Sequence, residues 1–328
     1  MASRRAAFAL FIGLGAFAAL AAWQGVHIIA ERLGQVGLRV LWLPLLHLPA
    51  LLLTTLCWVA LTLCKRPPFS RFLFARWVGF AANQLLPVAR VGGEVARGRL
   101  LLRAGAEATA TIAGVMADKT AQVASIAVLA GAGILALAWL RPGATMIATS
   151  IVGTIGIGLA VAGLYFAQRK LEVTARWVGR FLPAGTNREA AIRRTASALD
   201  ETYSRWGRVV FSVLCHTGFR FLLTVEIWWA LQWSGAELSL IEALVIESLG
   251  QVLRAGAFMI PGALGAQEGS FVLLGALFGI PAPMAISASL CRRARELLLG
   301  LPGLLAWQLV EGRAAWTAAS VSDRKPER

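Results

Sequence analysis

Charged residues are scarce in this sequence, and it lacks the short motifs of the commonest hydrolases and ATP-driven transporters. Asp, Glu, Lys and Arg make up only 15% of its 328 residues, whereas 58% are hydrophobic. No Walker A, HExxH or GxSxG stretch is present, which removes the commonest sequence signals for ATP-driven transport and for hydrolysis. The four cysteines show no CxxC spacing and the three histidines are scattered, so neither group indicates a metal site. We therefore expect no cofactor and no enzymatic activity.

Acidic residues are especially few, because 17 of them face 32 Lys and Arg, a formal net charge of +15. The mean hydropathy of +0.68 is far too high for a soluble domain of this length, so we expect a polytopic membrane protein. The basic residues flank apolar runs and do not form one soluble face, which argues against nucleic acid as a partner. We interpret them as determinants of topology that contact anionic lipid headgroups.

Six apolar runs are predicted to cross the membrane, namely residues 6–29, 38–64, 108–140, 144–168, 209–233 and 283–310. The first run also has a second interpretation as a signal peptide, but it is long enough to cross the bilayer and more runs follow. Basic residues concentrate in two loops, 65–76 and 169–208, which the positive-inside rule assigns to the cytoplasm, Arg71 and Arg76 included. We thus expect both termini on the cytoplasmic side of the membrane, with part of 169–208 as an amphipathic surface helix.

Two short stretches interrupt apolar surroundings in the same way. PVARVGGE runs from Pro87 to Glu94 and PGALGAQE from Pro261 to Glu268, with the same seven-residue step from proline to glutamate. A short apolar segment, 72–86, precedes the first stretch, which has basic flanks on both sides, and another short one, 269–280, follows the second stretch. We therefore predict two re-entrant hairpins of broken helices, whose freed backbone groups must line a cavity or a protein interior.

The resemblance between the two stretches extends beyond the motif. A shift of 174 residues places Asp118 and Lys119, in the long helix after the first hairpin, on Arg292 and Arg293, in the one after the second. We predict an all-α fold of about six transmembrane helices and two hairpins, built as an inverted-topology repeat. The single membrane domain, 1–328, would hold repeat one at about 72–140, repeat two at about 238–312 and a disordered basic tail at 313–328.

Helix ends and charges inside a membrane fold are candidate binding groups for an anionic headgroup. The alternatives are that a Pro-Gly break is only a kink, that the buried charges are only structural ion pairs, and that Arg97, Arg99 and Arg103 form an interfacial basic strip. The candidate substrate-binding residues are Asn83, Pro87, Arg90, Gly92, Gly93, Glu94, Arg97, Asp118, Lys119, Arg254, Pro261, Gly265, Gln267, Glu268, Arg292, Arg293, Arg295 and Glu296.

The stretch NQLLPVARVGGEVARGRLLLRAG, 83–105, resembles the signature of the flippase-like transmembrane domain of lysylphosphatidylglycerol synthases. The C-terminal stretch that contains PGALGAQEGS is similar, more narrowly, to the hopanoid-biosynthesis-associated branch of that superfamily. The resemblance covers nearly the whole chain. This sequence differs from the family pattern at Arg90 and Val91, where many relatives carry small residues. It also lacks the soluble aminoacyl-transferase domain of full-length synthases, so we do not expect synthesis of lysyl lipid.

The resemblance implies a flippase-like lipid translocator, energy-independent or ion-coupled, with hopanoids or other polar or anionic membrane lipids as cargo. One alternative is a membrane partner of lipid-biosynthesis enzymes that holds a lipid intermediate without transporting it. Another is an intramembrane transferase, for which Glu94, Glu268 and Asp118 would have to supply a base and a nucleophile. Transfer of lipid by the purified protein alone would distinguish the first hypothesis from the others.

Overall fold

The computed structural model describes residues 34, 36–63, 67–86, 92–142, isolated positions between 155 and 166, 188–256 and 266–322, without the side chains of 312–322. Within these residues the fold is all-helical and contains no strand. The elements are a 3-10 turn, Gly37–Leu41, and nine α-helices: α3 Trp42–Leu61, α4 Phe69–Leu85, α5 Gly92–Arg103, α6 Ala108–Leu140, α9 Arg188–Ser204, α10 Trp206–Trp233, α11 Leu240–Gly256, α12 Ala266–Ala276 and α13 Ala282–Ser322.

Three segments of the described part are long and apolar enough to cross a membrane: Gly37–Leu61, Ala108–Leu140 and Trp206–Trp233. They coincide with three of the six predicted crossings. The predicted crossing at 283–310 lies in α13, which is long enough but carries Arg292, Arg293, Arg295 and Glu296 in its first half. The crossings predicted at 6–29 and, apart from isolated helical positions, at 144–168 lie outside the described residues.

Helices α4 and α5 form an antiparallel pair. The side-chain Oδ1 of Asn83, near the end of α4, accepts a hydrogen bond of 2.9 Å from the backbone N–H of Gly93, near the start of α5. One turn earlier in α4, Gly79 lies against Gly93 and Arg97, so the residue numbers run in opposite directions along the two helices. A Cβ at Gly93 would overlap the Gly79 carbonyl oxygen and the Asn83 amide, so the close approach requires glycine there.

The second half of the chain repeats this arrangement. Helices α11 and α12 are packed together and α13 follows them, as α6 follows α4 and α5. By their lengths, α4 and α11 span about 25 Å and α5 and α12 less than about 20 Å, short of the roughly 30 Å hydrocarbon core of a bilayer. The two helix pairs therefore fall at the positions of the two predicted hairpins.

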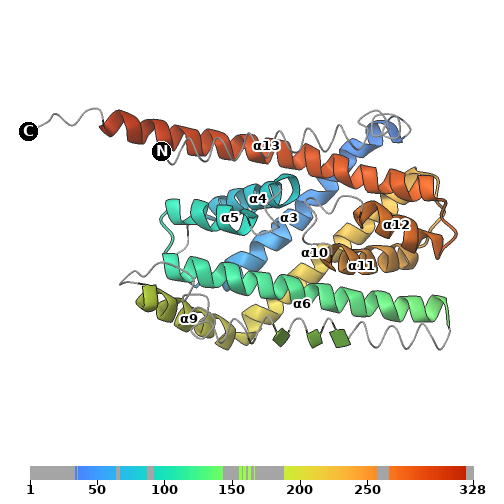
Figure 1. Cartoon of the computed structure of the whole chain (residues 1–328), viewed down its shortest axis with the longest axis horizontal. Helices are drawn as coiled ribbons and strands as arrows, with labels where there is room; N and C mark the ends of the chain where they lie inside the picture. The colour runs from blue at the N-terminus through green and yellow to red at the C-terminus, as the bar shows by residue number, and fades with distance from the viewer. Residues whose placement is uncertain are drawn as a thin grey trace, which may run out of the picture.

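Each helix pair packs on the long helix of the other repeat. Figure 1 shows α6 and α13 along opposite edges of the molecule, with α4 and α5 beside α11 and α12 between them, and α4 contacts α13 as α11 contacts α6. Small residues allow these contacts, because Gly300 and Gly303 of α13 lie against α4, and Gly133 of α6 lies against Ser248 of α11. Helices α3 and α10 cross between the two edges and pack extensively on each other.

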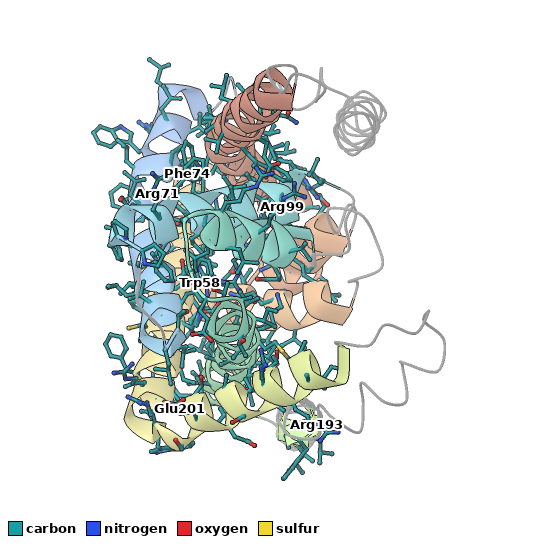
Figure 2. All side chains as sticks on the ribbon, turned by 90° about the vertical axis from the view of Figure 1, so that its left-hand side faces the viewer. Trp58, Arg71, Phe74, Arg99, Arg193 and Glu201 are labelled. Carbon is teal, nitrogen blue, oxygen red and sulfur yellow. The ribbon has the colours of Figure 1, made fainter. Side chains whose placement is uncertain are left out.

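The interior is apolar near α5 and polar at the centre. Trp58 of α3 is fully buried with Phe72, Val78 and Leu101 (Figure 2), whereas Arg193 and Glu201 of α9 lie at one end of the molecule, away from Trp58. Helix α9 packs on α6, where the Tyr203 hydroxyl donates a hydrogen bond of 2.9 Å to Thr120 Oγ1.

One expectation needs correction. Arg76, expected in a cytoplasmic basic flank, is 8% exposed, because α4 is packed between α3, α5 and α13 and turns this side chain inward. Helix α13 continues to Ser322, into the range 313–328 for which a disordered tail is predicted. The predicted surface helix near 176–182 lies outside the described residues.

Candidate substrate cavity

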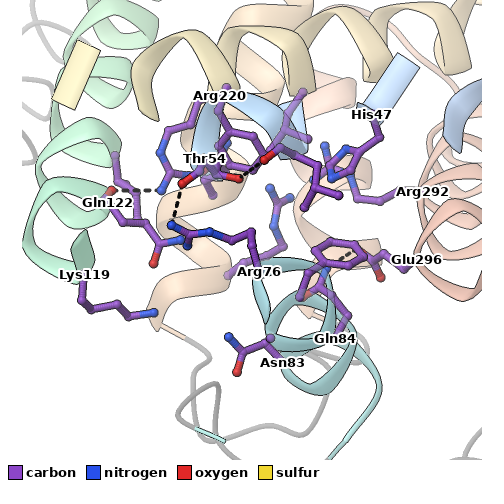
Figure 3. Close-up of a pocket in the computed structure, with 18 of the residues that line it drawn as sticks. His47, Thr54, Arg76, Asn83, Gln84, Lys119, Gln122, Arg220, Arg292 and Glu296 are labelled. Carbon is purple, nitrogen blue, oxygen red and sulfur yellow. Dashed lines mark hydrogen bonds between the residues drawn. The ribbon is translucent and has the colours of Figure 1, made fainter. Parts of the chain in front are cut away.

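A cavity of about 480 Å³ lies at the centre of the fold, where both repeats meet. Its wall takes side chains from α3, α4, α5, α6, α10, α11, α12 and α13 (Figure 3). The size falls within the range typical of small-ligand sites. The polar and charged lining residues are His47, Thr54, Arg76, Asn83, Gln84, Glu94, Arg97, Lys119, Gln122, Arg220, Gln251, Arg254, Gln267, Arg292, Arg295 and Glu296.

Asp118 is the centre of the ion-pair network on the side of repeat one. Its carboxylate is 1% exposed and accepts hydrogen bonds from Arg76 Nη2 at 3.0 Å and from Arg97 Nη1 at 2.6 Å. Its Oδ1 also lies 2.9 Å from Nε2 of His216, on α10. A buried carboxylate is stable only when it is compensated in this way. Asp118 therefore holds α4, α5, α6 and α10 together beneath the cavity wall.

The adjacent pair Asp118 and Lys119 does not form a local ion pair. Lys119 Nζ donates instead to Glu94 Oε1 on α5 at 3.0 Å, and Glu94 also pairs with Arg97 one turn along the same helix. The equivalent pair in repeat two is Arg293 and Glu268, whose Nε and Oε1 lie 2.7 Å apart. Both pairs join residues 25 positions apart. The two repeats thus share a bond between the second short helix and the long helix.

Another ion pair joins corresponding helices in each repeat, from different positions along the first helix and with the two charges exchanged. In repeat one Arg76 of α4 binds Asp118 of α6, and in repeat two Glu247 of α11 binds Arg292 of α13. Glu247 is fully buried and also accepts a hydrogen bond of 3.1 Å from Arg254. The short first helix of each pair is therefore tied to the long helix of its own repeat by a buried ion pair of opposite sense.

The third cluster joins α3 and α10 to α13, and α4 also contacts α13 there. Nδ1 of His47, on α3, lies 2.7 Å from Oε1 of Glu226 on α10, and Arg295 Nη1 of α13 lies 2.5 Å from Glu226 Oε2. Glu296 accepts a hydrogen bond of 2.8 Å from Gln84 of α4. Both histidines of the described part are therefore buried in ion-pair clusters.

Arg220 brings a further buried positive charge to the cavity from α10. Its guanidinium donates to Ser125 Oγ at 2.7 Å, to the Gln122 carbonyl oxygen at 3.0 Å and to the Gln251 side chain. These three acceptors belong to α6 and α11. Arg220 is thus positioned by both repeats and faces the space between them (Figure 3).

The structure brings together half of the predicted site residues. Those that line the cavity are Asn83, Glu94, Arg97, Lys119, Arg254, Gln267, Arg292, Arg295 and Glu296. Asp118 lies behind the wall, and Gly93 lies at the contact of α4 with α5. Gly92 begins α5, while Glu268 and Arg293 pair with each other outside the lining. Pro87, Arg90, Pro261 and Gly265 lie outside the described residues.

Sequence reasoning missed several lining or supporting residues, chief among them His47, Arg76, Arg220, Glu226 and Glu247. Three of these, His47, Arg220 and Glu226, lie within the long apolar runs, where an ionisable side chain is a functional candidate by default. That signal was available in the sequence. The three residues of the expected interfacial basic strip also differ in position. Arg97 is 2% exposed, whereas Arg99 and Arg103 are exposed and pair with Glu311 of α13.

The fold and the cavity define a class, a helical membrane protein with a central, mainly basic cavity between two related halves. Comparison with known families specifies it further. The sequence matches the family described as lysylphosphatidylglycerol synthase TM region over residues 7–303, and the chain belongs to that family. No curated protein and no solved structure matched the chain. The family indicates a membrane role related to lipids.

Proposed function

We propose that this protein is a lipid translocator of the bacterial inner membrane that admits a polar or anionic lipid headgroup into the central cavity. One observation carries the proposal: side chains from both repeats line a single cavity, and seven of the residues that line it are basic, namely Arg76, Arg97, Lys119, Arg220, Arg254, Arg292 and Arg295. Guanidinium groups bind phosphate and carboxylate through paired hydrogen bonds, and a low-dielectric surrounding strengthens that attraction.

The surface around this cavity suits a lipid as the ligand. The outward faces of the long helices expose large apolar side chains, among them Leu135 and Trp139 of α6 and Leu305 and Leu309 of α13. Acyl chains would remain among such side chains and the surrounding lipid, while only the headgroup entered the cavity. A protein that moves headgroups needs this combination of apolar exterior and charged interior.

The symmetry of the fold supports a transport mechanism. We propose that the pair α4 and α5 enters from and returns to the cytoplasmic side, and the pair α11 and α12 the opposite side, so that the repeats are inverted. In that arrangement each short pair packs on the long helix of the other repeat. Movement of one half against the other would then open the cavity to each leaflet in turn, as inverted repeats do in secondary transporters.

Hopanoids are the cargo that the resemblance of the C-terminal stretch implies, and other polar or anionic lipids fit the same chemistry. A leaflet-resolved assay on liposomes tests the proposal. Purified protein is reconstituted with a trace of head-labelled fluorescent phosphatidylglycerol, and a membrane-impermeant reductant then quenches the outer leaflet. We expect the quenched fraction to rise from about half to nearly all when the protein is present.

Protein-free liposomes, and liposomes that hold an unrelated membrane protein, should stay near one half. If the protein binds the lipid but the quenched fraction does not rise, translocation is refuted and the lipid-holding partner of biosynthetic enzymes becomes the better account. A label on an acyl chain should give the same result, which shows that the headgroup label itself is not what the protein moves.

A further inference from the structure

We infer that the pair His47 and Glu226 is a proton site, which takes up a proton when an anionic headgroup binds Arg295. This inference rests on the proposed function, because it names the ion that would move with the headgroup through the same cavity. The contacts of Nδ1 in His47 carry it, because that nitrogen lies between a carboxylate and a guanidinium.

Nδ1 of His47 has two competing partners. It lies 2.7 Å from Oε1 of Glu226 and 2.8 Å from Nη1 of Arg295. The same Nη1 lies 2.5 Å from Oε2, the second oxygen of Glu226. A ring nitrogen either accepts a hydrogen bond through its lone pair or carries a proton and donates. Because a guanidinium can only donate, this nitrogen accepts from Arg295 and has no proton to offer Glu226 while Arg295 stays in place.

Arg295 and a proton are therefore alternative partners of this nitrogen. Arg295 and His47 both line the cavity, so a headgroup oxygen there can draw the guanidinium toward itself. Glu226 is 5% exposed, and within the described residues Arg295 is the one guanidinium bonded to it. Its carboxylate would be left poorly compensated. A proton from the solvent, bound at Nδ1, would restore the balance through the contact of 2.7 Å that already exists.

The other buried histidine does not meet these conditions. Nε2 of His216 lies 2.9 Å from Asp118, but Asp118 bonds two guanidinium groups, those of Arg76 and Arg97. If a headgroup drew Arg97 away, Arg76 would still compensate the carboxylate. His216 is also fully buried and is not part of the cavity wall. The proton site is therefore assigned to His47, and His216 supplies a comparison.

The imidazole of His47 is enclosed by rings and by one charged helix. Phe80 of α4 and Phe219 of α10 have ring centroids 5.3 and 6.1 Å from that of His47. The charged groups of α13 that face the pair are Arg292, Arg295 and Glu296. His47 lies on the side of the cavity near Glu296, away from Lys119 (Figure 3). Water screens this enclosed pair little, so a shift of one nearby guanidinium decides its charge.

Charged groups on the remaining neighbouring elements are exposed or engaged with other partners. On α6, Asp118 and Lys119 pair with side chains of α4 and α5. Arg39, in the turn before α3, is exposed. Glu247 of α11 pairs with Arg292. Arg295 is thus the cation whose position controls the proton site.

Uptake of a proton with the headgroup has a direct consequence for transport. A singly charged phosphodiester headgroup and one proton together carry no net charge across the membrane. A pH difference would then drive the pair, whereas the membrane potential would do no work on it. By linkage, a lower pH favours lipid binding, because the bound state holds more protons than the free state.

The first experiment counts protons during lipid binding. Dioctanoyl phosphatidylglycerol, a singly charged phosphodiester, is titrated in a calorimeter into the detergent-purified full chain at about pH 7. The titration is made in Tris and in imidazole buffers, which carry no anionic group that competes for the cavity. The difference in heat, divided by the difference in buffer ionisation enthalpy, gives the protons taken up per lipid. We expect at least about half a proton, and equal heats after correction for dilution would overturn the inference.

Two matched variants assign the proton to a residue. The amide in His47→Gln can accept from Arg295 or donate to Glu226 but cannot take up a proton. His216→Gln makes the same change outside the cavity lining. We expect uptake to fall below about a tenth of a proton in His47→Gln and to remain in His216→Gln. Uptake that persists in folded, lipid-binding His47→Gln would contradict the assignment, as would an equal loss in both variants.

A measurement on the unchanged chain decides the matter if His47→Gln does not fold or no longer binds lipid. Nitrogen NMR on isotope-labelled histidine distinguishes a ring nitrogen that accepts from one that carries a proton. Addition of the lipid should convert the signals of one histidine from the neutral to the cationic form, and unchanged signals for all histidines would refute the inference. Lipid that binds without proton uptake would leave the proposed function in place, whereas proton uptake without translocation in liposomes would refute that function alone.

Discussion

Glu268 Oε1 of α12 lies 2.7 Å from Nε of Arg293 in α13, as Glu94 Oε1 of α5 lies 3.0 Å from Nζ of Lys119 in α6. The two bonds occupy equivalent places in the two repeats. Each ties the second short helix to the long helix that follows it. The repeated sequence motifs therefore correspond to a repeated contact between two helices. We expect both bonds to stabilise the fold in the same way.

The first prediction concerns the pair in repeat one. Glu94→Lys should place positive charges together and lower the thermal midpoint of the purified protein, whereas the double change Glu94→Lys with Lys119→Glu should regain much of the loss. The coupling free energy should be about 1 kcal/mol, the order expected for residues in direct contact. Additive effects of the two changes would show that the bond does not stabilise the fold.

The corresponding exchange in repeat two, Glu268→Arg with Arg293→Glu, should behave alike if the halves are equivalent. The exposed pair Glu201 and Arg205 of α9, whose Oε1 and Nη2 lie 2.8 Å apart, supplies a control. Reversal of that surface pair should change the midpoint little, because water screens it.

The second prediction concerns the close contact of α4 with α5. Gly93→Ala should destabilise the protein by about 1 to 3 kcal/mol, because the added Cβ overlaps the Gly79 carbonyl oxygen and the Asn83 amide. Gly98→Ala, five residues later in the same helix, meets its nearest atom only at 4.0 Å and should be neutral or stabilising. Thermal unfolding in detergent measures both, and equal effects would mean that the contact is not tight.

Much of this architecture follows from the sequence, because proline and glycine residues that stand close together favour the end of a helix. Single prolines such as Pro49 in α3 and Pro302 in α13 do not end their helices. The repeated PVARVGGE and PGALGAQE stretches predicted the ends of α4 and α11 and the starts of α5 and α12. Apolar length and composition likewise predicted α6 and α10. These are local properties, and local properties can be read from a single chain.

The pairing of charges was not predictable in the same way. Asp118 and Lys119 are neighbours in sequence, yet successive side chains point in different directions from a helix, and their partners lie on different elements. Arg76 was misplaced because the positive-inside rule counts basic residues near a run and takes no account of which ones packing turns inward. The cavity depends on contacts between residues about 200 positions apart, such as Gln84 with Glu296.

The third prediction concerns membrane topology. In a variant whose native cysteines have been replaced, an impermeant thiol reagent added to the periplasm should label Glu237→Cys, in the exposed turn between α10 and α11, but neither Arg71→Cys nor Arg103→Cys. Arg71 and Arg103 lie near the outer ends of the pair α4 and α5, and a re-entrant pair keeps both ends on the cytoplasmic side.

Permeabilised cells should label all three positions, which shows that each cysteine is reactive. If Arg103→Cys labels from the periplasm and Arg71→Cys does not, the segment between them crosses the membrane. The repeats would then not be inverted in the way proposed.

The central claim is that positive charge in the cavity drives headgroup transfer, and one matched comparison in the liposome assay tests it. Lys119→Gln removes a positive charge from the cavity wall, and Arg141→Gln removes one from the exposed residue that follows the same helix, α6. We predict that Lys119→Gln lowers the initial rate of phosphatidylglycerol transfer at least about tenfold, with folded protein retained, and that Arg141→Gln leaves the rate unchanged. Equal rates for wild-type protein and both variants would contradict the account.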